Sequence, residues 1–332
     1  MRSELLEVLR CPETGQRFLI KDIEYREGEI FSGWLVTEDG NRRYPIRDFI
    51  PRFVPESNYA DNFGMQWNKF RKTQLDSFSG HPISSSRFWK STGWKPEELT
   101  GQWVLDVGCG AGRFAEIALQ AGAKVVALDY SSAVSACYAN LNHYPHLHVV
   151  QGDIYRLPLP RGFFSYVYSL GVLQHTPDVA KAFSALPPMV AERGRLCVDF
   201  YEKSWKSMFL PKYWLRPITK RMSKVQLFSI LETLVPKLFM LSRLLARVPI
   251  IGGGLRRMFP VANYVGILPL SDQQHLEWSL LDTFDWLSPE FDHPQSAATL
   301  RQWLKDAGME QPEVFTEGHL VGRGWAAHAH RY

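Results

Sequence analysis

The segment VLDVGCGAGR, residues 104–113, holds the residues most suggestive of chemistry in this 332-residue chain. Its apolar start predicts a strand, and Gly108, Gly110 and Gly112 follow it in the spacing G-x-G-x-G. A dinucleotide turn has the spacing G-x-G-x-x-G and a P-loop ends in G-K-[ST], so this segment fits neither. Asp106 would repel a pyrophosphate beside such a turn but suits a ligand that carries an ammonium group. The segment therefore predicts a binding site for an amino-acid nucleoside.

Four segments in order resemble the motifs of class I S-adenosylmethionine-dependent methyltransferases: VLDVGCGAGR, VVALDY, QGDIYRLP and SLGVLQHTPD. The resemblance covers residues 99–201 and 295–332. It implies S-adenosylmethionine as cofactor, S-adenosylhomocysteine as product and no metal ion. One glycine motif alone would be weak evidence, whereas four motifs at consistent strand ends are specific.

The resemblance also implies roles for particular residues. The glycine loop would wrap the methionine part of the cofactor, with Asp106 supporting that end. Asp129 would accept hydrogen bonds from both ribose hydroxyls, Asp153 would contact the adenine amino group, and Ile154 would pack on the ring. Asp129 as a helix cap is the plainer alternative. The remaining cofactor-binding candidates in these motifs are Cys109, Arg113, Tyr130, Leu170 and Gln174.

Methyl transfer from a sulfonium is an in-line displacement, for which the protein mostly supplies alignment. A hydroxyl acceptor also needs a base near the moment of attack. His175 in LQHTPD is the first candidate, although it could equally orient a loop or pack on the cofactor, and Glu202 after the fifth strand is the second. The candidate substrate-binding residues are Gln66, Trp67, Tyr201, Asp282 and Asp285.

From Leu99 onward the chain alternates apolar strands with amphipathic helices. Nearly unbroken apolar strands predict a parallel sheet covered on both faces, with ligands at the carboxyl ends of its strands. We therefore predict an α/β, Rossmann-like sheet of seven mostly parallel strands with an antiparallel last strand, formed by residues 99–201 and 295–332. A bridging helical segment (56–98) precedes it, and a helical cap (202–294) interrupts it.

Residues 1–55 predict a small β segment that resembles the zinc-ribbon-like domain found beside some methyltransferases. That domain usually carries C-P-x-C and a second cysteine pair. Here Cys11 stands alone, and Thr14 occupies the place of the second cysteine. Tetrahedral zinc needs about four Cys or His ligands, so we expect a metal-free remnant.

The cap contains the helical pattern KVQLFSILETLVPKLFMLSRLLARVP, in which a kink is expected at Pro236. Lys237, Arg243 and Arg247 would flank its apolar face. Such a helix either packs against the domain or lies on an anionic membrane, and the second case favours a lipid-linked acceptor. A basic cap could also receive an anionic sugar. The predicted apolar face consists of Leu227, Ile230, Leu231, Leu234, Leu238, Leu241, Leu245 and Val248.

The composition of the chain narrows the function classes. It is 45% hydrophobic and 22% charged with a net charge of +4, which fits a packed globular protein. We find no signal-peptide core and no run of about 18 uncharged apolar residues, so a cytoplasmic protein without a membrane span is expected, with peripheral contact to a membrane as the second option. The predicted function is biosynthetic methylation of a hydroxyl on a small molecule, glycan or lipid-linked acceptor. An RNA methyltransferase, which the modest charge disfavours, and a non-catalytic binding module are the alternatives.

Overall fold

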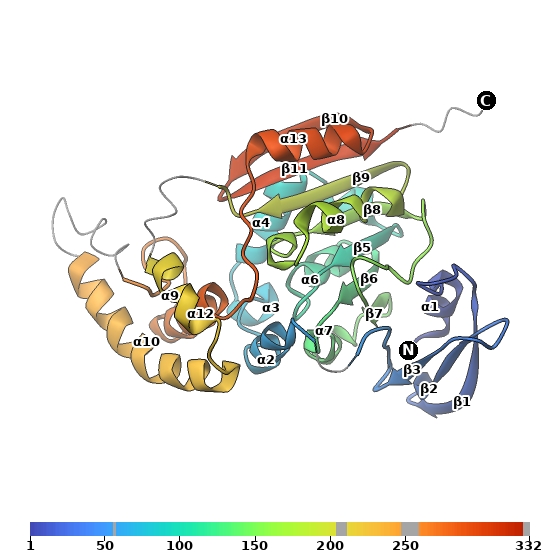
Figure 1. Cartoon of the computed structure of the whole chain (residues 1–332), viewed down its shortest axis with the longest axis horizontal. Coiled ribbons are helices and arrows are strands. Elements are labelled where there is room, and N and C mark those ends of the chain that lie inside the picture. Colours follow the sequence, from blue (N-terminus) through green and yellow to red (C-terminus); the bar gives the residue numbers. More distant parts are fainter. Residues whose placement is uncertain (56–57, 204–210, 247–258, 328–332) are drawn as a thin grey trace.

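The structure of the chain is a computed structural model that describes residues 1–55, 58–203, 211–246 and 259–327. Its centre is a seven-stranded sheet with the order β10-β11-β9-β8-β5-β6-β7 (Figure 1). Strands β5 to β9 are parallel to one another. Strand β11 is antiparallel to both β9 and β10. The predicted fold class is therefore confirmed. The strands are β5 (Trp103–Val107), β6 (Lys124–Asp129), β7 (Leu147–Gln151), β8 (Phe164–Ser169), β9 (Val190–Phe200), β10 (Met309–Glu317) and β11 (His319–Ala326).

Both faces of this sheet are buried because successive strand residues point to opposite sides. Val104 belongs to the hydrophobic cluster under α4 (Ile83–Thr92), α6 (Arg113–Gln120) and α7 (Ala133–Leu141). Its neighbour Leu105 belongs to the cluster on the other face, under α8 (Val179–Ser184) and α13 (Ala297–Asp306). This two-sided burial explains why the strands read as continuous apolar runs.

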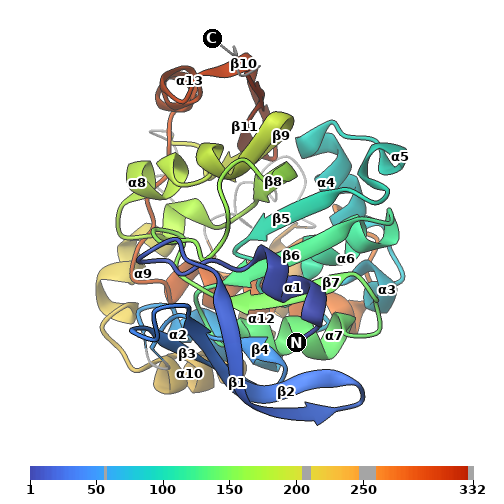
Figure 2. The same ribbon diagram turned by 90° about the vertical axis from the view of Figure 1, so that its right-hand side faces the viewer.

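The N-terminal segment forms a separate four-stranded antiparallel sheet beside the β7 edge (Figures 1 and 2). The Phe53 amide donates to the Gln151 carbonyl at 2.8 Å, and the Arg52 guanidinium donates to the Gln151 side chain at 2.7 Å. These bonds attach the small sheet to the last parallel strand. Its elements are α1 (Ser3–Val8), β1 (Phe18–Arg26), β2 (Glu29–Thr37), β3 (Arg43–Arg47) and β4 (Ile50–Pro51).

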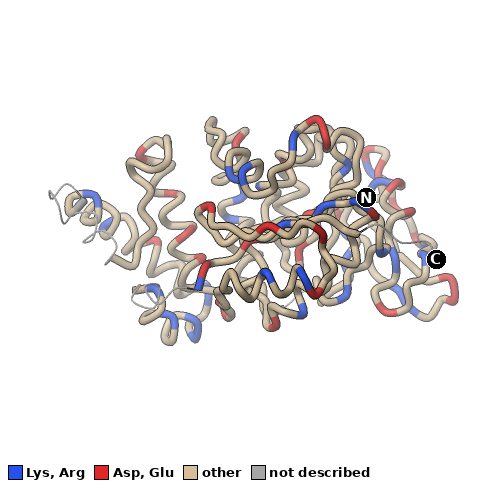
Figure 3. The backbone as a smooth tube through the Cα atoms, turned by 90° about the horizontal axis from the view of Figure 1, so that it is seen from above, with Lys and Arg blue, Asp and Glu red and all other residues tan. Residues whose placement is uncertain are grey.

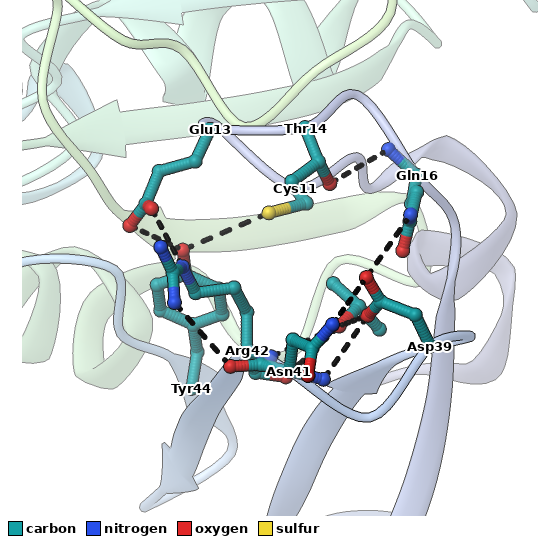
Figure 4. A network of polar contacts seen from close by, with 9 residues as sticks. Cys11, Glu13, Thr14, Gln16, Asp39, Asn41, Arg42 and Tyr44 are labelled. Carbon is teal, nitrogen blue, oxygen red and sulfur yellow. Dashed lines mark hydrogen bonds and ion pairs between the residues drawn. The ribbon is translucent and has the colours of Figure 1, made fainter.

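A polar network joins the two turns of this small sheet (Figure 4). Cys11 Sγ lies 3.7 Å from Tyr44 Oη, which donates to Glu13 at 3.3 Å. Arg42 Nε donates to the same carboxylate at 2.6 Å. Charge-assisted hydrogen bonds of this length give the turns a fixed geometry. Within the described residues, no three His, Cys, Asp or Glu side chains are grouped to hold a metal ion. The zinc-ribbon resemblance stays a prediction.

Helices α2, α9, α10 and α12 of the bridging segment and the cap pack together at the carboxyl ends of the central strands (Figure 1), whereas α4 covers a face of the sheet and α5 directly precedes β5. Phe70, Val235 and Phe284 belong to one hydrophobic cluster that joins the bridge, α10 and α12. The cap therefore has a small core of its own. The helices are α2 (Asp61–Lys69), α3 (Asp76–Ser79), α5 (Pro96–Leu99), α9 (Pro211–Thr219), α10 (Lys224–Ala246) and α12 (Asp272–Leu287).

The predicted apolar face of α10 is wrong in part. Leu227 and Leu231 are buried as expected, together with Phe228, Val235 and Phe239. Ile230, Leu234 and Leu241 are instead more than 40% exposed. Phe228, Val235 and Phe239 point toward α12 and α2, and their side chains fill the space between these helices. The helix continues through Pro236, and Val248 lies outside the described residues.

Helix α10 can be compared with a membrane-spanning helix by its length and composition. Lys224–Leu245 of α10, with a mean hydropathy of 1.4, is long and apolar enough to cross a membrane by length and composition alone. Only 33% of that window is buried in the protein. The segment contains Lys224, Glu232, Lys237 and Arg243 and so is not an uncharged run, and the expected lack of a membrane span stays a prediction.

Gly112 starts α6 and lets that helix approach α7 closely. It has φ +94°, and a Cβ there would lie 2.5 Å from Leu141 Cδ1. We expect Gly112→Ala to lower the free energy of unfolding by about 3 kcal/mol, from left-handed strain plus the clash. Gly101→Ala is the matched control, since Gly101 has φ +71° with nothing within 4 Å, and should cost about 1 kcal/mol. Denaturant unfolding measures both, and equal losses would contradict the close approach.

Candidate active site

A cavity of about 780 Å³ opens between the central sheet and the cap. Gly108, Gly110 and Asp129 line it at the carboxyl ends of β5 and β6. Trp278 and Asp282 of α12 line its other side. The cavity therefore joins the predicted cofactor half to residues of the cap in one space.

The glycine loop is held against β6 by backbone hydrogen bonds. The amides of Gly108 and Cys109 both donate to the Leu128 carbonyl, at 2.7 and 3.0 Å. Gly108 and Gly110 have φ +86° and +53°, which a residue with a Cβ adopts only under strain. The indole of Trp67 lies 3.2 Å from where a Cβ of Gly110 would be, so the predicted acceptor-side residue Trp67 packs on the loop itself.

Asp129 stands at the end of β6 with its carboxylate in the cavity wall. Its Oδ2 accepts from the Gly110 amide at 2.9 Å, and its Oδ1 accepts from the Ser131 amide and hydroxyl at 2.8 and 2.7 Å. Burial nevertheless raises the pKa of this carboxyl. Oδ2 keeps one of its two lone pairs for a ligand hydroxyl, whereas both lone pairs of Oδ1 are taken until the Ser131 hydroxyl rotates away.

Other predicted cofactor residues also line the cavity. Ile154 and Leu170 contribute apolar surface, and Tyr130 stacks on Tyr59 with ring centres 4.9 Å apart. Cys109 lines the loop and is buried. These side chains form an apolar slot next to the Asp129 carboxylate, which suits a nucleoside.

Asp106 and Asp153 are not among the described residues that line the cavity. The Asp153 carboxylate accepts from the Tyr155 amide at 2.9 Å and so shapes the turn after β7. Asp106 is 2% exposed beneath the glycine loop, and its Oδ2 has no hydrogen-bond partner among the described residues. Its predicted support of the cofactor would act from below the loop.

The buried Asp106 predicts a pH dependence of stability. Burial raises its pKa to about 8, whereas an unfolded aspartate has a pKa of about 3.9. Between these values the folded state binds the extra proton, so stability falls as pH rises through this window. We expect Asp106→Asn to remove this loss, making the variant about 3 kcal/mol more favourable relative to wild type at pH 8 than at pH 5. Denaturant unfolding at both pH values checks this, and parallel pH curves for the two proteins would contradict it.

Two guanidinium groups lie at the cavity wall. Arg113 donates to Ser84 Oγ at 2.8 Å and to Gln74 Oε1 at 2.9 Å, and burial lowers its pKa to about 9. Arg87 of α4 forms an ion pair of 2.7 Å with Asp199 and also lines the cavity. No motif points to Arg87, because α4 lies before the first motif and its sequence matches none.

His175 lies in the cavity wall in a defined orientation. Its Nδ1 is 3.0 Å from the Phe291 carbonyl, which can only accept, so Nδ1 carries the proton. Nε2 of the neutral ring is then an acceptor, and it has no partner among the described residues. The ring lies between Phe63 and Tyr201, with ring centres 5.4 and 5.6 Å away. The residue lines the cavity while Nε2 itself is buried, so a side chain movement or a group that reaches in from the cavity would be needed to bring a proton to Nε2.

Two further predicted site residues, Glu202 and Gln174, do not line the cavity. Glu202 is exposed, accepts from Thr316 Oγ1 at 3.3 Å and is outside the cavity wall, so it does not reach the cleft as expected. The parallel bridge between Glu202 and Gln295 holds this segment on the outside of the sheet. Gln174 is fully buried, and it too is absent from the described cavity wall.

Two carboxylates of α12 face the cavity together, because residues three apart share a helix face. Asp282 accepts from Tyr264 Oη at 2.5 Å and from Gln74 Nε2 at 3.3 Å, and burial raises its pKa to about 7. Asp285 accepts from Gln66 and Tyr201.

The structure thus brings four of the predicted substrate residues together, Gln66, Tyr201, Asp282 and Asp285. No motif points to Tyr264 and Gln74, because both belong to loops. His319 of β11 also lines the cavity, and burial lowers its pKa to about 4.

Comparison with known proteins identifies the central part of the chain. Residues 105–198 match the protein family described as "Methyltransferase domain". Ubiquinone biosynthesis O-methyltransferases of Rhodopseudomonas palustris (strain TIE-1) and Bradyrhizobium diazoefficiens are 30% and 31% identical over 119 residues. Each alignment covers 34% of this chain and 45% of the relative, so the chain spans less than half the length of these relatives.

Solved structures of similar shape include an S-adenosylmethionine-dependent methyltransferase from Aquifex aeolicus, at 12% identity and a TM-score of 0.41. That alignment covers 81% of this chain and 98% of the other. The family match begins in β5, contains the glycine loop and ends in β9, so it holds the Asp129 side of the cavity. Residues 105–198 therefore match a methyltransferase domain, and this match covers less than a third of the chain.

Proposed function

We propose that this chain transfers a methyl group from S-adenosylmethionine to a hydroxyl of a small-molecule, glycan or lipid-linked acceptor. The observation that carries the proposal is the single cavity in which the Asp129 carboxylate and the glycine loop face the α12 carboxylates. Methyl transfer needs cofactor and acceptor in one shielded space at close approach. The distant relatives named above as O-methyltransferases support an oxygen acceptor.

The residues of the cavity fit S-adenosylmethionine, which supplies an activated methyl group on a sulfonium sulfur. Asp129 holds the ribose hydroxyls, while Tyr130 and Ile154 enclose the adenine. Arg87, Lys90 and Arg113 line the cavity and are cations available to the amino-acid carboxylate. These contacts orient the cofactor along the glycine loop.

His175 accepts the proton of the acceptor hydroxyl at its Nε2 as the new carbon–oxygen bond forms. The Phe291 carbonyl holds the ring in the tautomer that this step needs. Phe63 and Tyr201 border the ring and keep water away from it. The proton leaves later by exchange with solvent.

The acceptor half of the cavity favours a neutral or cationic molecule with several hydroxyls. Asp282 and Asp285 would repel an anionic group placed between them. Tyr264 and Gln74 add hydroxyl and amide groups, and Trp67 and Trp278 add flat apolar walls. Carboxylate, amide and aromatic surfaces together suit a sugar ring or a polyhydroxylated aromatic compound.

The test uses the full chain with methyl-labelled S-adenosylmethionine and a cell extract divided into aqueous-metabolite, lipid and RNA fractions. Label in the metabolite or lipid fraction, lost with Asp129→Ala, would support the proposal. Label confined to RNA would contradict it and favour the RNA alternative. Bound cofactor without label in any fraction would argue for a non-catalytic binding protein.

A further inference from the structure

The outer surface of the cap carries apolar side chains that nothing in the described structure covers. Ile230, Leu234 and Leu241 of α10 are 43%, 44% and 43% exposed, and Leu244 is 59% exposed. Spacings of four, seven and three residues place these four side chains along one side of the helix. Ile218 of α9 is 66% exposed. We call the four α10 residues the α10 stripe.

Single exposed apolar residues are ordinary, but contiguous apolar surface marks an interaction site. The buried side of α10 already packs against α12 and α2 through Leu231, Val235 and Phe239. The α10 stripe is therefore not needed for the core of the cap. It also has no role in the cavity, whose described walls contain none of its residues.

The charge of this part of the chain selects a partner. Residues 211–246 contain seven Lys and Arg and one acidic residue, Glu232, which forms an ion pair of 3.1 Å with Lys69 (Figure 3 marks the charged positions). Four of these cations have partners within the protein: Lys212 and Arg216 pair with Asp292, Arg243 pairs with Asp272, and Lys224 donates to the Ser288 carbonyl. Lys220 and Arg221 are exposed at the turn between α9 and α10. Lys237 is exposed within the α10 stripe itself, three residues after Leu234 and four residues before Leu241. Apolar side chains bordered by cations match the surface of a bilayer with anionic headgroups.

We propose that α9 and α10 dock this protein onto an anionic lipid bilayer, with the α10 stripe in the headgroup region and the helix lying along the surface. The length of α10 would also allow it to span a membrane. Spanning would expose Val235 and Phe239 to lipid and break the core shared with Phe284, whereas lying on the surface leaves that core intact. The proposal concerns a surface outside the cavity and holds whether or not the chain is a methyltransferase.

The experiment is sedimentation of the full chain with vesicles of phosphatidylcholine alone or with added phosphatidylglycerol. We expect binding to the anionic vesicles, at least about tenfold weaker binding to the neutral ones, and loss of binding in high salt. The variant Ile230→Ser/Leu234→Ser/Leu241→Ser should weaken binding about tenfold or more. The variant Lys220→Glu/Arg221→Glu/Lys237→Glu should do the same through charge alone.

The matched control is Leu19→Ser/Ile23→Ser, which replaces exposed apolar residues of β1, 55% and 40% exposed, far from the cap. It should bind vesicles like the wild type, and circular dichroism should show all variants folded. Equal binding by the serine triple variant, or equal binding to neutral vesicles, would overturn the proposal. So would a wild-type dimer that the triple variant dissociates while no vesicle binding occurs, because the stripe would then join two copies of this chain.

Discussion

Replacing Asp129 with alanine is expected to weaken S-adenosylmethionine binding about a hundredfold. Its carboxylate is the group at the end of β6 that can accept from two ribose hydroxyls. Two hydrogen bonds to a charged acceptor contribute about 1.5 kcal/mol each, which together correspond to about two orders of magnitude in Kd. Isothermal calorimetry with the purified chain measures the change directly.

Asp129 also anchors the glycine loop, so the prediction needs a control that separates the two effects. Ser131→Ala removes the hydroxyl that donates to Asp129 at 2.7 Å but leaves the carboxylate in place. We expect this variant to lose only a few-fold in affinity. An unchanged Kd for Asp129→Ala would overturn the ribose assignment. Equal losses in both variants would mean that loop geometry, and not direct contact, determines the affinity.

The central sheet could be predicted because its pattern is local. In strands such as β6 the run VVAL is apolar, because both faces of the sheet are covered. An amphipathic helix follows such a strand. The carboxyl ends of the parallel strands then place Gly108, Asp129 and Leu170 at one edge of the sheet, independently of how the cap helices pack. Chemistry that depends on strand ends is therefore visible in one sequence.

The cap was harder to predict because its helices pack on one another. In α10 apolar residues occupy most positions, so the pattern allowed more than one buried face. The choice between Leu234 and Val235 as the core residue is made by α12 and α2, which are distant in sequence. The same reason hides Arg87, Tyr264 and His319, whose place in the cavity depends on tertiary contacts alone.

Glu202 was predicted to reach the cleft, and this prediction is wrong. Its position directly after the fifth parallel strand suggested the cleft, but the strand edge continues only as far as Tyr201, whose side chain lines the cavity. Successive side chains of an extended chain point in opposite directions, so Tyr201 faces inward and Glu202 faces solvent. A shift of one residue decides which of the two is part of the site.

Replacing His175 with alanine is expected to lower kcat about a thousandfold while leaving the Kd for S-adenosylmethionine within a few-fold of wild type. The loss follows because Nε2, unpaired among the described residues, is the acceptor for the hydroxyl proton, whereas the ribose contacts belong to Asp129. Single-turnover kinetics with the acceptor found by the labelling experiment measure the chemical step, and calorimetry measures the cofactor.

A structural role for His175 would give a different result, and a second variant distinguishes the two. His175→Phe keeps an aromatic ring beside Phe63 and Tyr201 but has no nitrogen for the proton or for the Phe291 carbonyl. If His175 is the base, His175→Phe should be as slow as His175→Ala although it packs better. If turnover returns with the ring alone, His175 shapes the cavity, and the proton must go to another acceptor in the wall. Asp282, with its pKa raised to about 7 by burial, would then be the carboxylate to replace next.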